Sequence, residues 1–207
     1  MSDDFLFTPD HYFRELRKEE IFPASAEAPL EVDLGCGEGH FIAGMADLFP
    51  DRNFLAVERL QGRVKNTVRK LRESGLKNGK VLRLETAYTV AWLLPTAGVS
   101  RVHLLCPDPW PKKKHHARRL VNRVDFLNGL HRVLEVGGEF LLKTDDTEYF
   151  ENAMESMSTL AVDQSSGQEL FERLEWDEEA FPYPQTGFER HWLGMGRSIH
   201  RARWRKC

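Results

Sequence analysis

Acidic side chains stand at the ends of five short apolar runs, where a protein could gather negative charge for chemistry. They are Asp33 in "EVDLGCGEGHF", Glu58 in "FLAVE", Glu85 in "VLRLE", Asp108 after "VHLLCP" and Asp145 after "EFLLKT". Carboxylates accept hydrogen bonds from sugar hydroxyls and base N–H groups, and they attract cations. The pattern predicts a site for a nucleoside-like ligand.

A glycine-rich loop follows the first of these runs. Gly35, Gly37 and Gly39 permit a tight turn and let a ligand approach the backbone closely. A dinucleotide loop would have the pattern G-x-G-x-x-G, but here the third glycine comes one residue early and His40 takes its place. Because this loop also contains Asp33, it would repel a pyrophosphate and suit a cation. A nicotinamide oxidoreductase is therefore disfavoured.

The second and third runs end in carboxylates suited to the rest of a nucleoside. Glu58 lies 21 residues beyond Gly37, where it can accept hydrogen bonds from both ribose hydroxyls. Glu85 is expected to meet the adenine edge. Acids around a ribose and a positively charged sulfonium fit S-adenosylmethionine better than a dinucleotide, so S-adenosylmethionine is the predicted cofactor.

Asp108 lies between two prolines and is followed by a tryptophan. Pro107 and Pro109 restrict the backbone and remove N–H groups, so the turn is stiff and the carboxylate is aimed. Trp110 offers a flat face on which a base could stack. The alternative is a rigid surface turn in which Trp110 only fills core.

Basic residues are segregated along the chain, although the net charge is -3. Six Lys or Arg and no acid lie between residues 109 and 124, and six more lie in residues 190–207. By contrast, residues 145–179 contain twelve acids and one base. Lys112 to Lys114, with Arg118 and Arg119, could hold phosphates, so one strongly positive face for nucleic acid is predicted. Solvated surface runs are the alternative.

The bulk properties are those of one globular α/β domain. The 207 residues contain no apolar run near the roughly 20 residues that cross a bilayer, and the N-terminus lacks the features of a signal peptide. Cys36, Cys106 and Cys207 are odd in number and distant in sequence, which predicts a reduced cytoplasmic protein without disulfides. Their spacing fits no zinc site, and no metal or membrane partner is expected.

Strand-like and helix-like segments alternate along the chain. Strands are predicted at 30–34, 53–58, 81–85, 102–106 and 139–144, and helices at 40–49, 63–75 and 119–135, with Gly75 and Gly137-Gly138 as helix stops. This alternation predicts a doubly wound, mostly parallel sheet with helices on both faces. A helical N-terminal arm (1–29) precedes the main domain (30–207). An acidic helix after Thr147, a strand in "ELFERLEW", a loop "DEEAFPYPQTGFERH" and a last strand in the tail complete the prediction, with that last strand antiparallel.

The motifs "EVDLGCGEG", "FLAVE", "CPDPWPKKKHHARRLV", "GGEFLLKTDD" and "TGFERH" resemble, in this order, the bacterial tRNA (guanine-N(7)-)-methyltransferases. The resemblance covers about residues 28–206. It implies a Rossmann-like class I methyltransferase that uses S-adenosylmethionine to methylate N7 of a guanine in the tRNA variable loop.

Position by position, the resemblance implies roles for specific residues. Asp108 would be catalytic. Cofactor contacts would fall on Asp33, Glu58, Glu85 and Asp108, and substrate contacts on Lys112, Asp145, Thr186, Gly187, Phe188 and Glu189. Position 33 usually carries glutamate in this family, and Glu85-Thr86 stands where aspartate and alanine are usual. The resemblance therefore leaves open whether Asp33 and Glu85 contact the cofactor directly or through water.

Two alternatives stay open from the residues alone. One is a methyltransferase of the same fold that acts on an exocyclic amine of RNA or DNA, and the other is a non-catalytic RNA-binding protein. The oligomeric state, monomer or homodimer, is open as well.

Overall fold

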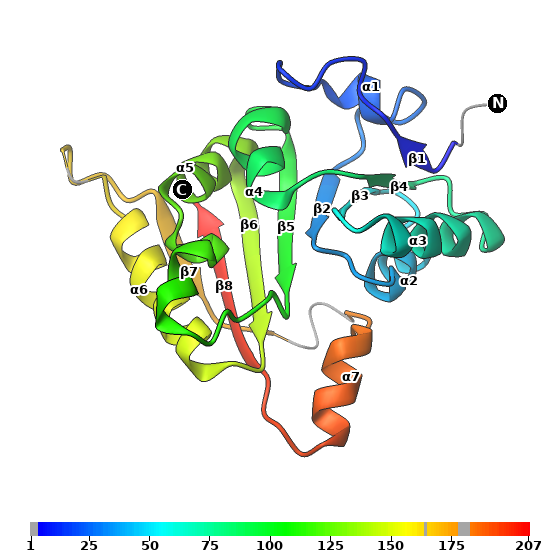
Figure 1. The fold of residues 1–207 in the computed structure, drawn as a ribbon. Helices are drawn as coiled ribbons and strands as arrows, with labels where there is room; N and C mark the ends of the chain where they lie inside the picture. Colours follow the sequence, from blue (N-terminus) through cyan, green and yellow to red (C-terminus); the bar gives the residue numbers. More distant parts are fainter. Residues whose placement is uncertain (1–3, 164, 178–182) are drawn as a thin grey trace.

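The computed structural model describes residues 4–163, 165–177 and 183–207, which form one mixed sheet flanked by helices (Figure 1). Its eight strands run in the order β1-β4-β3-β2-β5-β6-β8-β7. The strands are β1 (Leu6–Phe7), β2 (Leu30–Leu34), β3 (Asn53–Val57), β4 (Gly79–Leu82), β5 (Val99–Leu105), β6 (Leu134–Thr144), β7 (Phe171–Leu174) and β8 (His200–Lys206).

The α-helices and shorter helical turns lie mostly between these strands. The α-helices are α1 (Lys18–Ile21), α2 (His40–Leu48), α3 (Gln61–Glu73), α4 (Thr86–Tyr88), α5 (Val124–Val133), α6 (Thr147–Leu160) and α7 (Gly187–Gly194). A π-helical turn η1 (Thr89–Leu93) follows α4, and two 3-10 turns, η2 (Lys113–Arg118) and η3 (Leu120–Asn122), precede α5. Not one helix in the described ranges is long and apolar enough to cross a membrane.

Strand β8 pairs antiparallel with both β6 and β7, and the other strand pairs are parallel. The predicted architecture, mostly parallel with an antiparallel strand near the C-terminus, is therefore confirmed. The strand order reverses at β2, whose neighbours are β3 and β5. In open α/β sheets the ligand site lies at this reversal, beyond the carboxyl ends of the strands.

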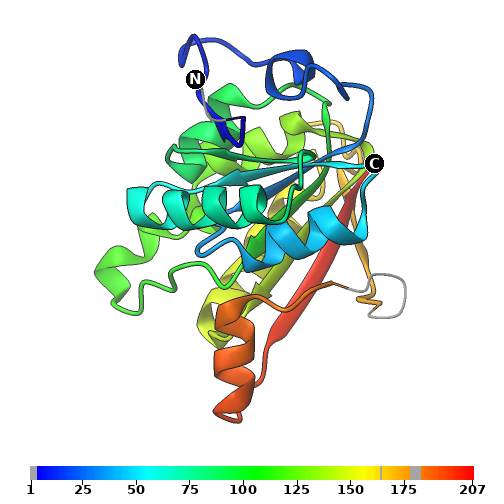
Figure 2. The same cartoon turned by 90° about the vertical axis from the view of Figure 1, so that its right-hand side faces the viewer.

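Helices cover the two faces of the sheet (Figure 2), and each face carries its own apolar cluster. Helices α2 and α3 cover one face with residues such as Met45 and Leu71, both fully buried. Helices α5 and α6 cover the other face, where Leu130 and Met157 belong to the larger cluster. These helices fix the strands and so fix the positions of the strand ends.

The N-terminal arm packs on the domain that follows it. Strand β1 pairs with β4 at the edge of the sheet, and Leu16, Ile21 and Phe22 are buried in the larger core. The predicted helix over this arm is short, because only Lys18–Ile21 is helical. The division into an arm (1–29) and a domain (30–207) stays a prediction.

Several predicted boundaries differ from the structure. Strand β4 ends at Leu82, so Glu85 leaves the sheet and caps α4. The predicted helix 119–135 is wrong at its start, because residues 120–122 form a 3-10 turn and α5 begins only at Val124. Gly137-Gly138 lies inside β6 instead of ending a helix. Gly137 has a φ of +81°, which glycine adopts at low cost in a strand irregularity. The predicted loop 177–191 contains the start of α7, while 178–182 lie outside the described residues.

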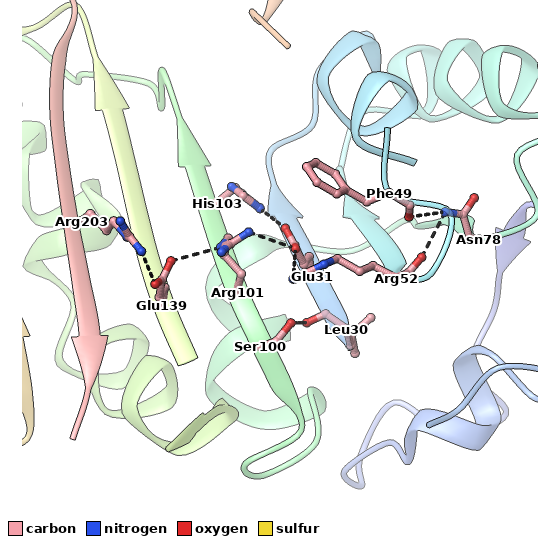
Figure 3. Close-up of polar contacts among 10 residues, drawn as sticks. All are labelled: Leu30, Glu31, Phe49, Arg52, Asn78, Ser100, Arg101, His103, Glu139 and Arg203. Carbon is pink, nitrogen blue, oxygen red and sulfur yellow. Dashed lines mark hydrogen bonds and ion pairs between the residues drawn. The ribbon is translucent and has the colours of Figure 1, made fainter. Parts of the chain in front are cut away.

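A row of charged side chains crosses the strands on one face of the sheet (Figure 3). Glu31 is almost fully buried and accepts hydrogen bonds from Arg52 (2.9 Å), Arg101 (3.2 Å) and His103 (2.7 Å). Arg101 and Arg203 then share Glu139, at 3.3 and 2.5 Å. Burial alone would raise the pKa of Glu31, but its partners lower it overall. Arg203 of β8 is therefore directed at a carboxylate of the sheet.

Candidate active site at the carboxyl ends of the strands

The five acidic residues predicted from the sequence meet at one end of the sheet. A cavity of about 500 Å³ is lined by Glu58, Glu85, Asp108 and Asp145. A second cavity of about 260 Å³ is lined by Asp33, with glycines of the loop after β2. Both cavities are lined by Gly35, Leu105 and Phe188, so they adjoin one another.

The glycine loop after β2 is shaped by close packing on α3. Gly39 has a φ of +73°, and a Cβ there would come within 2.5 Å of the Thr67 side chain. Thr67 donates a hydrogen bond to the Gly37 carbonyl at 3.2 Å, which holds the loop against α3. Gly37 itself has a φ of +56°. This loop therefore needs glycines for its conformation as well as for access to a ligand.

Asp33 is the buried carboxylate of the smaller cavity. Its Oδ2 atom accepts no hydrogen bond among the described residues. Burial, with the nearby charge of Glu58, raises the pKa of Asp33 to about 7. A buried, unpartnered carboxylate oxygen is costly to the fold, and a cationic ligand group would relieve that cost.

Glu58 and Glu85 line the far side of the larger cavity. Glu58 accepts a hydrogen bond from the Leu60 N–H at 2.8 Å and lies 3.8 Å from the Arg63 guanidinium. Glu85 accepts from the Tyr88 N–H at 2.6 Å, which caps α4, and its other oxygen lies 3.7 Å from Arg123. Each carboxylate is held by a backbone N–H and keeps lone pairs for a ligand.

Asp108 occupies the stiff turn after β5. Both ends of this turn have left-handed backbone, with a φ of +49° at Cys106 and +47° at Trp110. The Cys106 N–H donates to the Lys143 carbonyl at 2.7 Å, which ties the turn to β6. The Asp108 side chain is exposed to the cavity solvent and has no hydrogen-bond partner among the described residues.

Asp145, directly after β6, lines the same cavity and pairs with an arginine. Arg197, in the segment after α7, donates a hydrogen bond to it at 3.1 Å. Burial and the nearby Asp145 raise the pKa of the Cys106 thiol to about 12, so this thiol stays neutral and is a poor nucleophile.

Within the described residues, no group of three or more His, Cys, Asp and Glu side chains could hold a metal ion.

Trp110 lines the same cavity and already makes stacking contacts. The Arg118 guanidinium lies 5.0 Å from the centre of its ring, and the His115 ring lies 5.9 Å away at 61°. The ring is half-buried, so it is not simply core. A base that stacked on the face covered by Arg118 would have to displace that guanidinium.

Helix α7 begins at the cavities. Thr186 caps it by accepting a hydrogen bond from the Glu189 N–H at 2.9 Å, and Thr186, Gly187 and Phe188 all line the smaller cavity. Glu189 lines neither cavity. It is 1% exposed and accepts hydrogen bonds from Lys143 at 3.0 and 3.2 Å and from Arg201 at 3.3 Å. Its carboxylate holds α7 on the sheet.

Two predicted phosphate ligands have different surroundings. Lys112 is exposed on the loop beyond Trp110 and lines neither cavity. Arg119 is wrong as a phosphate ligand in this structure, because its side chain is fully buried and bound by carbonyl and carboxylate oxygens. The second basic run is also engaged, since Arg203 and Arg205 pair with Glu139 and Glu172.

Other lining residues were missed by the sequence analysis. Arg63 lies 5.9 Å from the Phe188 ring centre and beside Glu58, and Arg123 lies beside Glu85. Tyr149, on α6, also lines the larger cavity. Arg63 follows Glu58 by five residues and lies in the first turn of α3, which is a weak local signal, whereas Arg123 is brought to the site only by the fold.

Comparison with known proteins is consistent with this arrangement. The model of a family described as "Putative methyltransferase" matches residues 27–202. The tRNA (guanine-N(7)-)-methyltransferase of Syntrophotalea carbinolica is 34% identical over 172 residues, covering 83% of this chain and 72% of that protein. The chain belongs to the tRNA (guanine-N(7)-)-methyltransferase family. The enzyme of that name from Geobacillus kaustophilus is 40% identical over 150 residues, covering 72% of this chain and 67% of that protein.

Solved structures support the fold of this methyltransferase family member. The 16S rRNA methyltransferase KamB is similar with a TM-score of 0.61, covering 94% of this chain and 96% of that one. The aminoglycoside resistance methyltransferase NpmB1 gives a TM-score of 0.59, covering 93% and 95%. At 18% and 16% identity, these likenesses concern the fold alone. The class I methyltransferase fold is thus confirmed, and a nicotinamide oxidoreductase and a non-catalytic RNA-binding protein are both set aside.

Proposed function

We propose that this methyltransferase transfers a methyl group from S-adenosylmethionine to N7 of a guanine in the variable loop of tRNA. The observation that carries the proposal is the set of five carboxylates around two adjoining cavities, next to the exposed basic turn η2. Membership in the tRNA (guanine-N(7)-)-methyltransferase family supports the choice of substrate.

The residues of the two cavities suit this cofactor. Asp33 offers an unpartnered, buried oxygen to a cationic group. Glu58 can accept hydrogen bonds from ribose hydroxyls, and Glu85 is available to the adenine edge. S-adenosylmethionine would supply an electrophilic methyl group on a sulfonium.

The reaction does not require the protein to remove a proton from guanine N7. Guanine N7 has an in-plane lone pair and carries no proton in the neutral base, so no general base is needed. The protein contributes by aligning the nitrogen with the methyl group, which can lower the barrier by several kcal/mol. Because the methylated purine gains positive charge, nearby carboxylates stabilise the transition state.

Asp108 is the carboxylate best placed for that task. Asp145 already shares its charge with Arg197, whereas Asp108 faces the cavity without a partner among the described residues. Both can accept N–H groups of guanine, and adenine presents a different edge, so carboxylates here favour guanine.

Nucleoside analysis tests the reaction directly. Unmodified tRNA is incubated with the protein and a methyl-labelled cofactor, digested to nucleosides and analysed by mass spectrometry. We expect 7-methylguanosine with the wild type and a loss of at least about 100-fold in kcat with Asp108→Ala, because one preorganised electrostatic group contributes about this much. The cofactor Kd of this variant is expected to stay within about threefold.

Asp47→Ala is the matched control, since Asp47 is exposed on α2 and lines neither cavity. A product methylated on an exocyclic amine would contradict methylation at N7 and support the alternative reaction, in which an enzyme of this fold acts on an exocyclic amine. Wild-type turnover in Asp108→Ala would refute the role of Asp108 even if 7-methylguanosine forms.

A further inference from the structure

Arg119 is the largest side chain that the fold buries completely. Its Nε donates to the Pro109 carbonyl at 2.8 Å, its Nη1 donates to Asn152, and its Nη2 lies 3.4 Å from a carboxylate oxygen of Glu148. The guanidinium carbon lies 5.7 Å from the centre of the Tyr149 ring. All three nitrogens are therefore engaged inside the protein, and none can reach a phosphate.

The carbonyl that Arg119 holds belongs to the strained turn that carries Asp108. Non-glycine residues with left-handed backbone, such as Cys106 and Trp110, cost of order 1–3 kcal/mol each and persist only where neighbours enforce them. The hydrogen bond from the Cys106 N–H to β6 enforces one end. The hydrogen bond from Arg119 to Pro109 enforces the other end, directly after Asp108.

The partners of Arg119 connect this turn to the second acidic strand end. Glu148, Tyr149 and Asn152 lie on the first two turns of α6, and α6 is capped by Asp146, the neighbour of Asp145. Arg119 thus ties the turn after β5 to the helix after β6. Asp108 and Asp145 both line the larger cavity, so Arg119 connects the two elements that carry these carboxylates.

We propose that Arg119 is a positioning residue, which fixes the direction of the Asp108 carboxylate by holding the Pro109 carbonyl on α6. The inference rests on the proposed function and deepens it. Asp108 has no side-chain partner among the described residues, so its aim depends on its backbone. The neighbouring Arg118 is exposed and lies on the Trp110 ring, so two adjacent arginines have separate tasks.

Arg119→Lys tests the proposal because it keeps the charge but loses the three-way contact of the guanidinium. We expect kcat to fall about 10- to 100-fold, since small displacements of reacting groups have effects of this size. The cofactor Kd, the tRNA Kd and its salt dependence are expected to change less than about threefold. Asn152→Ala, which removes one partner and leaves Arg119 in place, should give a smaller loss of the same kind.

Hydrogen exchange of the peptide spanning 106–118 supplies a readout that needs no activity. We expect faster exchange in Arg119→Lys than in the wild type, and no change in the control variant Arg69→Lys, whose side chain is exposed on α3. Unchanged exchange, or a loss confined to tRNA affinity with a lower salt slope, would overturn the proposal. A wild type that never methylates tRNA would instead count against the proposed function, and exchange would still decide the role of Arg119.

Discussion

At the end of β2, the fold buries Asp33 beside Glu58 and leaves its Oδ2 unpartnered, and burial and that neighbour raise its pKa to about 7. The unfolded chain ionises this group near 3.8. The folded state therefore binds more protons between these values, and stability falls as the pH rises from about 4 to 7. Ionised Asp33 opposes folding at neutral pH.

Asp33→Asn should accordingly stabilise the protein without ligand. Since one pKa unit corresponds to about 1.4 kcal/mol, the free energy of unfolding should rise on the order of 4 kcal/mol at pH 8 and less than half as much at pH 5. Urea unfolding at the two pH values measures this difference. If the variant were equally stable or less stable than the wild type at pH 8, the ionised Asp33 carboxylate would not destabilise the folded protein.

The same variant should bind the proposed cofactor more weakly, because the neutral amide does not attract a cation. In the wild type, cofactor affinity should fall as the pH drops through about 7, and in Asp33→Asn this dependence should disappear. Titration calorimetry at pH 6 and pH 8 measures both effects. A stabilised apo protein with weaker binding would identify Asp33 as a residue kept for function at a cost in stability.

Among the elements, α7 is attached to the sheet by a buried ion cluster. Glu189 pairs with Lys143, which is 3% exposed, and with Arg201. Glu189→Gln would leave the Lys143 ammonium buried without a counter-charge, which typically costs about 3–5 kcal/mol. We expect a loss of this order in the free energy of unfolding, with faster proteolysis at Arg190 on α7.

The double variant Lys143→Met with Glu189→Leu provides the control, because replacing both partners of a buried pair by apolar side chains of similar volume is often nearly neutral. Most of the lost stability should return in thermal unfolding. If Glu189→Gln unfolds like the wild type while cofactor and tRNA affinity fall, the carboxylate contacts a ligand, as the family resemblance implies, and does not fasten the helix.

Elements with a strong local pattern were predictable from the sequence. The apolar run 30–34 ends at the glycine loop, so β2 and its carboxyl-end site followed directly. Arg119 did not follow, because its partners on α6 are about 30 residues away and its position in a basic run indicates a surface role. The same holds for Glu189 on α7, whose partners Lys143 and Arg201 lie on β6 and β8. The burial of Arg119 and Glu189 thus depends on partners that the fold supplies from other elements.

Over the whole molecule, some basic residues of the two runs stabilise the fold and others are exposed on the surface. In β8, Arg203 and Arg205 pair with the sheet carboxylates Glu139 (Figure 3) and Glu172, and Arg201 pairs with Glu189 on α7. Lys112, Lys113 and Lys114 are exposed beside the larger cavity, and the structure records no ion pair for them among the described residues. The surface available for phosphates is therefore smaller than the two basic runs of the sequence suggest.

Lys112→Ala tests that assignment through salt dependence. Each phosphate contact releases condensed counterions, so losing one should flatten the slope of log K against log salt by about 0.7–0.9. We expect weaker tRNA binding at low salt, with the difference from the wild type shrinking as salt rises, because the variant has one cation fewer. Lys77→Ala is the control, since Lys77 is exposed at the start of β4, at the opposite end of the sheet from the cavities. Equal slopes for Lys112→Ala and the wild type in filter-binding titrations would remove Lys112 from the tRNA surface.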